Sequence, residues 1–224
     1  MSRSLTESVT QQLRQDILRC VLRPGARLRT GDLCDRFDVS LAVVRESLSR
    51  LAAEGLVLAD PQRSFQVAPI SVADLNDVTW LRIEIETLAL RTAIARHTLD
   101  WEEAVVASLH RLLRTPLYRD GQAPPITEEW ARAHATFHEA LAAGCASPSL
   151  LAVRASLFDR SERYRRMSAR PGGETRDLDA EHRAIAEAAL RHDAGEACAL
   201  LARHFSLTAE LTLANLELVG ADCA

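Results

Sequence analysis

Residues 23–57, RPGARLRTGDLCDRFDVSLAVVRESLSRLAAEGLV, carry the most ordered local pattern in this 224-residue chain. The pattern predicts a short helix over 31–37, a tight turn at Asp38-Val39 and a longer helix over 40–54. Gly55 follows the longer helix, at a place where a helix C-terminus favours a residue in the left-handed conformation. Together these features predict a helix-turn-helix. The inner face of its second helix is formed by Val44, Leu48 and Leu51.

The segments on either side predict a winged form of this motif. Residues 5–22 place apolar side chains on one face at helical spacing, which predicts a preceding helix. Two short β-prone runs, 56–58 and 65–67, lie on either side of a polar turn and predict a hairpin. We therefore expect a winged helix-turn-helix domain over residues 1–70.

Residues 71–224 have helical periodicity throughout, so the fold class we expect is mainly α. The pattern predicts an antiparallel bundle of six helices, or seven if one of them is divided. Asp100 is the expected cap of the second helix, and Gly144 is expected to close the third. The expected helices cover 74–97, 101 to the loop at 119–125, 127–143, 147–169, 176–192 and 194–218.

Charge is distributed unevenly between these two predicted domains. The whole chain has 27 basic residues, all of them arginine, against 31 acidic ones, for a net charge of −4. Residues 1–70 hold 10 arginines and 8 acidic residues, whereas residues 71–224 hold 17 and 23. A negative net charge of the whole chain argues against a protein that coats nucleic acid or a membrane along its entire surface. A slightly basic first domain remains compatible with DNA binding by that domain alone.

The five cysteines are odd in number and scattered, without a Cys-x-x-Cys pair. This pattern is typical of reduced thiols in a cytoplasmic protein rather than of a disulfide framework. The sequence has neither an N-terminal signal pattern nor an apolar run that approaches 18 residues, so we expect a soluble cytoplasmic protein without a membrane partner.

The predicted second helix of the helix-turn-helix carries candidate DNA-binding residues. Ser40 is its expected N-cap, and the amides of its first turn can also bind a phosphate. Arg45 can make a bidentate contact to guanine, and Arg63 at the hairpin tip can reach a minor groove or a phosphate. The alternative is that Arg45 is an ordinary exposed residue on the polar face of an amphipathic helix, with no role in DNA binding. The candidate set is Ser40, Leu41, Arg45, Ser49 and Arg63.

Residues 23–57 resemble the DNA-binding head of the GntR family of bacterial transcription regulators. Three positions depart from that family: Leu41 replaces the usual arginine after Val-Ser, Val43 replaces a proline, and Ser64 replaces the glycine of the wing tip. Because Leu41 replaces that arginine, we expect Arg45 to make a larger share of the base contacts than it would in a typical member of the family. The matching positions are the Pro-Gly turn at 24–25, Leu28, Leu33, Val-Ser at 39–40, Val-Arg-Glu at 44–46, Leu48, Leu51 and Glu-Gly-Leu at 54–56.

Four histidines of the second domain are candidate metal ligands. His134 and His138 are one helical turn apart, so their imidazoles share a face and can chelate one ion. His182 and His204 fall in apolar registers of the last two helices. Neutral imidazoles that meet in a bundle interior suit a divalent ion such as zinc or nickel. Taken singly, each histidine is better explained as an exposed residue or as a hydrogen-bonded core residue than as a metal ligand.

Residues 72–218 resemble the ligand-sensing domain of the FadR subfamily, called the FCD domain. The resemblance implies that His138, His182 and His204 are metal ligands and that His134 replaces the acidic or amide fourth ligand. It also implies that Arg82 meets the carboxylate of a small effector; a salt bridge from Arg82 to Glu86 also explains this arginine, and the two roles are compatible. Tyr164 is a weaker candidate for the same pocket. The matching positions are Leu-Arg-x-x-x-Glu at 81–86, Phe-His at 137–138, Glu-His-x-x-Ile at 181–185, Asp193 and His-Phe at 204–205.

These patterns predict a homodimeric repressor that binds a palindromic operator in double-stranded DNA and responds to a divalent metal and a small organic acid. Two alternatives remain open at this point. The ion itself can be the signal, with no organic effector. A metalloenzyme is less favoured, because residues 134–138, HATFH, lack the glutamate of the His-Glu-x-x-His motif and so place no general base beside a metal-bound water. We expect the chain not to be an enzyme.

Overall fold

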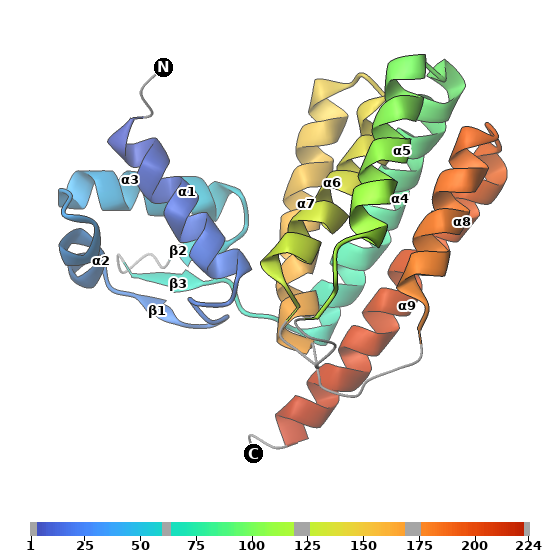
Figure 1. Ribbon diagram of the computed structural model, residues 1–224. Coiled ribbons are helices and arrows are strands. Elements are labelled where there is room, and N and C mark those ends of the chain that lie inside the picture. Colours follow the sequence, from blue (N-terminus) through green and yellow to red (C-terminus); the bar gives the residue numbers. More distant parts are fainter. Residues whose placement is uncertain (1–3, 60–63, 119–125, 169–175, 222–224) are drawn as a thin grey trace. The chain divides into compact units, whose positions relative to one another are not determined.

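The computed structural model describes residues 4–59, 64–118, 126–168 and 176–221 (Figure 1). The chain divides into two compact units. The first contains the residues up to 75 together with 159–167, and the second contains 76–158 and the residues from 168 onward. The division lies close to the expected boundary at residue 70, but it also assigns part of one late helix to the first unit.

The first unit contains the expected winged helix-turn-helix. Its helices are α1 (Leu5–Leu18), α2 (Thr30–Phe37) and α3 (Leu41–Ala53), and its strands are β1 (Arg27–Leu28), β2 (Val57–Ala59) and β3 (Phe65–Val67). The strands form an antiparallel sheet in the order β1-β3-β2, with Leu28 opposite Phe65 and Val57 opposite Val67. The hairpin prediction is confirmed for β2 and β3. It missed β1, because a strand of two residues is too short to show an alternating pattern.

Two residues in the left-handed conformation shape this unit. One ends α1 earlier than predicted, and the other forms the predicted turn between α2 and α3. Helix α1 ends at Leu18 rather than at residue 22, because Cys20 adopts a left-handed conformation with φ of 57°. The turn between α2 and α3 is made by Asp38, which is also left-handed, with φ of 51°. Aspartate tolerates this conformation better than most residues do, so the tight turn needs no glycine.

One apolar cluster joins the elements of the first unit. Its members come from all three helices and from the sheet, which fixes the orientation of α3 on the rest of the unit. Val44, Leu48 and Leu51 are fully buried, so the predicted inner face of α3 is confirmed. The cluster consists of Val9, Leu13, Ile17, Leu28, Leu33, Val44, Leu48, Leu51, Leu56, Val57, Phe65 and Val67.

The remaining helices confirm the expected bundle. In the described part of the chain there are six of them, and none is long and apolar enough to cross a membrane. Helix α5 begins one residue earlier than Asp100, and its N-cap is Thr98; Asp100 instead lies in the first turn, where the helix dipole also favours an acid. The helices are α4 (Val72–Arg96), α5 (Leu99–Leu113), α6 (Glu128–Ala143), α7 (Pro148–Ser168), α8 (Leu178–Leu190) and α9 (Ala194–Ala221).

Gly144 is the C-cap residue of α6, and close packing rather than backbone conformation requires a glycine at this position. Its φ is −61°, a right-handed conformation that any residue adopts. A Cβ atom at this position would lie 2.8 Å from Cδ1 of Trp101 and 2.9 Å from Cβ of Ala93. The residue therefore lets α6 approach α4 and α5 closely.

Gly144→Ala is expected to lower the free energy of unfolding by about 1–3 kcal/mol, because the added methyl group overpacks a rigid contact. Urea denaturation followed by circular dichroism measures the effect. The control is Gly195→Ala in α9, where the added Cβ would make an ordinary contact of 3.4 Å with Oδ1 of Asp193. Equal stability of the two variants would contradict the packing explanation.

Candidate metal centre and DNA-binding surface

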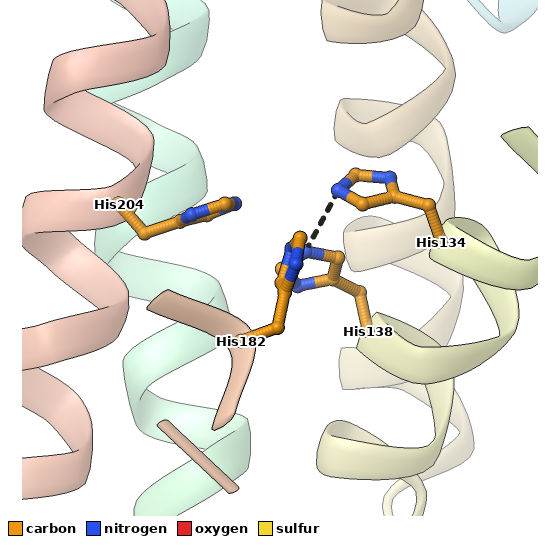
Figure 2. A group of neighbouring side chains, drawn as sticks. All are labelled: His134, His138, His182 and His204. Carbon is orange, nitrogen blue, oxygen red and sulfur yellow. Dashed lines mark hydrogen bonds between the residues drawn. The ribbon is translucent and has the colours of Figure 1, made fainter. Parts of the chain in front are cut away.

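Four histidines converge inside the second unit (Figure 2). His134 and His138 come from successive turns of α6, His182 comes from the first half of α8, and His204 comes from α9. All four are buried, and one candidate ligand atom from each lies within 4.8 Å of the others. The structure thus brings together the whole set of histidines that the sequence analysis singled out.

The rings are in direct contact with one another. Nε2 of His138 lies 3.1 Å from Nε2 of His134. The His182 ring centroid is 4.8 Å from that of His204 and 5.2 Å from that of His134. A group of this size, with donor atoms from three helices, matches the dimensions of a single-ion site.

Burial favours the neutral form of three of these imidazoles, those of His138, His182 and His204. The pKa of His138 is well below its ordinary value, because desolvation and then the neighbouring His134 disfavour the charged ring. Desolvation lowers the pKa of His182 to about 3, and it also lowers the pKa of His204. A neutral imidazole has a nitrogen lone pair available for a metal ion, so the protonation state at neutral pH suits metal binding.

The hydrogen-bond inventory also fits a metal ion. Within the described residues, no side chain hydrogen-bonds either ring nitrogen of His182, and Nδ1 of His138 has no hydrogen-bond partner. Buried polar atoms normally have partners, so such atoms need a physical explanation. An all-imidazole donor set is typical of zinc, nickel and copper sites rather than of calcium or magnesium sites. The residues present therefore fit a borderline divalent ion.

Aromatic side chains surround the histidines. The indole of Trp130 stacks on the His134 ring at a centroid distance of 4.6 Å, one helical turn before it on α6. Phe137 and Phe205 lie 5.4 Å from His182 and 5.5 Å from His138, respectively. These rings give the site an apolar wall. Trp130 was not among the predicted site residues, although its position four residues before His134 could have identified it.

Arg82 lies in the wall of the same site. It is only 8% exposed, its Nε donates to Oε1 of Glu86 at 3.0 Å, and its Cζ lies 4.0 Å from the centre of the Phe205 ring. The salt bridge expected as the alternative role of Arg82 is therefore confirmed. Arg154 of α7 donates to the other oxygen of Glu86 at 2.9 Å. The positive charge of Arg82 contributes to the lowered pKa of His138 and of His204, which places it near the histidines.

Tyr164 is buried in the other compact unit. Its hydroxyl accepts a hydrogen bond from the Ser71 amide at 3.1 Å and donates to Oδ2 of Asp74. The neighbouring Arg163 donates to the carbonyl oxygen of Ala68 at 2.8 Å. These contacts give Tyr164 a role in holding residues 68–74, and its place in an effector pocket stays a prediction.

The outer surface of α3 presents the predicted DNA-binding side chains. Leu41, Arg45 and Ser49 are spaced by four residues and are all exposed, so they form one stripe. Ser40 is the N-cap residue as predicted, but its side chain makes no capping hydrogen bond. Arg63 lies outside the residues that the structure describes.

A pocket of about 480 Å³ lies in the second unit beside the histidine cluster. Two of its lining residues touch that cluster: Trp130 stacks on His134, and Arg176 contacts His204. Its volume is in the range of small-molecule sites. The lining consists of Leu113, Arg114, Thr115, Pro116, Leu117, Trp130, Arg176, Asp177, Leu178 and Asp179.

Comparison with known families matches both units. Residues 5–67 match the family described as bacterial regulatory proteins of the gntR family, and residues 77–207 match the FCD domain. The chain belongs to the GntR family. It is a DNA-binding transcription regulator with a winged helix-turn-helix and an FCD domain.

Relatives of this GntR protein cover most of its length. BphR of Paraburkholderia xenovorans, an HTH-type transcriptional regulator, is 37% identical over 90% of this chain and 82% of its own. GlaR of Escherichia coli, an HTH-type transcriptional repressor, is 33% identical over 86% and 88%. Among solved structures, E. coli McbR/YncC has the same fold, with a TM-score of 0.74 at 22% identity over the full length of both chains.

The histidine cluster predicts a pH dependence of stability for the metal-free protein. His182 titrates near 6.5 in an unfolded chain but at about 3 in the folded one. Between these values the unfolded state binds the additional proton, so the free energy of unfolding falls as the pH is lowered from 6.5. Urea denaturation after chelation, at pH 7.5 and 5.5, measures the loss.

His182→Leu is expected to lose less stability than the wild type over this pH interval, because it removes one group that resists protonation. The control is His110→Leu, since His110 is exposed on α5. If His182→Leu and His110→Leu lose the same stability as the wild type, the buried neutral state of His182 is not supported.

Proposed function

We propose that this GntR regulator is a homodimeric repressor whose FCD domain binds a divalent metal ion through His134, His138, His182 and His204 and a small carboxylate effector beside that ion. The observation that carries the proposal is the convergence of four buried imidazoles whose candidate ligand atoms all lie within 4.8 Å of one another. When bound, the ion would supply a positive centre that attracts the effector carboxylate. Zinc and nickel are the ions that best suit four neutral nitrogen donors.

Arg82 supports the effector part of the proposal. A guanidinium group has several donors in one plane and binds a carboxylate at two points. Arg82 is held against Phe205, whose ring lies 5.5 Å from that of the metal-ligand candidate His138. A carboxylate that contacts both Arg82 and the ion would therefore need to span only a short distance.

The exposed stripe of α3 supports operator binding. A two-fold symmetric operator requires two copies of α3, one for each half-site, which is the reason for the proposed dimer. The direction of control is proposed from GlaR, which is named a repressor. In this proposal the acid shifts the dimer toward an arrangement with lower operator affinity.

The metal and effector hypotheses are tested by fluorescence anisotropy on DNA from upstream of the protein's own gene. Zinc with a panel of small carboxylic acids is expected to weaken binding of the wild type. Arg82→Ala should lose the response to the acid, and His138→Ala should lose the response to both. Arg183→Ala, at an exposed position of α8, is the control and should respond as the wild type does.

Two other outcomes of this experiment have clear meanings. A response to zinc alone, unchanged by any acid and by Arg82→Ala, would replace the effector proposal with a metal sensor. A failure of the wild type to prefer its own upstream DNA over random DNA would overturn the proposed operator.

Arg45→Ala is expected to weaken operator binding by about 1–3 kcal/mol and to relax base preference, because it removes the side chain able to contact guanine at two points. Arg132→Ala is the matched control: it changes the net charge equally, but Arg132 lies on α6 and is 66% exposed. If both variants bind DNA equally well, Arg45 does not read a base.

A further inference from the structure

His204 has a carboxylate directly behind it. Its Nδ1 lies 2.8 Å from Oε2 of Glu181, the residue that precedes His182 on α8. A carboxylate oxygen accepts hydrogen bonds, so a neutral His204 in this contact carries its proton on Nδ1. The lone pair is then on Nε2, which is the atom left to bind an ion.

Glu181 is itself held in place by Arg176. The Nε and Nη2 atoms of Arg176 each donate to one oxygen of Glu181 at 2.6 Å. Nη2 also donates to the His204 carbonyl oxygen at 3.0 Å, and Nη1 donates to Oγ1 of Thr208 at 2.9 Å. Glu181 therefore contacts the guanidinium of Arg176 with both of its oxygens and the His204 ring with one of them.

A second contact at Nδ1 is weaker and does not change this assignment. Nη2 of Arg176 lies 3.3 Å from Nδ1 of His204, and a guanidinium can only donate, which would require the opposite tautomer. The contact of 2.8 Å with an ionised carboxylate is shorter and charge-assisted, so it determines where the proton lies.

We propose that Glu181, fixed by Arg176, is a positioning residue that holds His204 in the tautomer and orientation needed to bind the ion. This inference rests on the proposed metal site and identifies its outer support. Such a partner fixes the ring and increases the basicity of the ligand nitrogen. His182 differs, because no side chain in the described part of the chain hydrogen-bonds its ring nitrogens. His204 is therefore the ligand that α8 and α9 hold in place before an ion arrives.

Arg176 also lines the 480 Å³ pocket. The contacts that hold His204 therefore include a residue, Arg176, that also lines this pocket. Loss of Glu181 would remove the acceptor of the His204 Nδ1 proton, whereas loss of Arg176 would leave Glu181 in contact with His204. We therefore expect substitution of Glu181 to have the larger effect.

The test measures zinc affinity of the full chain by competition with a chromogenic chelator. Glu181→Gln is expected to weaken zinc binding by about 10- to 100-fold, and Arg176→Gln is expected to weaken it less. The control is Glu187→Gln, which makes the same substitution at an exposed position of α8. Far-UV circular dichroism of the metal-free proteins verifies that each variant is folded.

A double-mutant cycle with His204→Ala separates positioning from a general structural role. If Glu181 acts through His204, Glu181→Gln has no further effect on zinc affinity when His204 is already absent. An equal loss in both backgrounds would overturn the proposal, as would wild-type affinity of Glu181→Gln. If the wild type binds no zinc, both the proposed metal site and this inference are wrong. If the wild type binds zinc and Glu181→Gln binds it equally well, the metal site is supported and only this inference is wrong.

Discussion

The arrangement of the helical unit depends on the burial of four imidazoles in one interior. An imidazole can enter such an interior at low cost only if it is uncharged and if its nitrogens find partners. Trp130 and Phe205 pack against the rings of His134 and His138, and desolvation lowers the pKa of His138 and His182. The same burial that lowers the pKa of these rings leaves nitrogen lone pairs that a divalent ion can use.

The charged groups around this interior are arranged in contacts that join helices. Glu86 of α4 contacts Arg82 of its own helix and Arg154 of α7. Glu181 of α8 contacts Arg176 and, through His204, helix α9. Breaking a buried ion pair costs more than the pair contributes, so these contacts define the geometry of the site more than they add to stability. The site and the packing of the bundle therefore depend on each other.

Most of the fold was predictable from local pattern. Helices of three or more turns show the 3.6-residue period clearly, which is why α3 and the six bundle helices were identified. The errors lie at element ends and in short elements: β1 has two residues, α1 ends at Leu18, and α5 is capped by Thr98. Hydrogen bonds of single residues determine such ends, and periodicity is insensitive to them.

The sequence was sufficient to identify the helix-turn-helix and the four histidines, because residue type and helical spacing specify which side chains share a face. It could not show that Glu181 and Arg176 both contact His204, or that the Tyr164 hydroxyl contacts Ser71 and Asp74. These contacts join residues far apart in the chain. They depend on how whole helices pack against one another, which the period of a single helix does not encode.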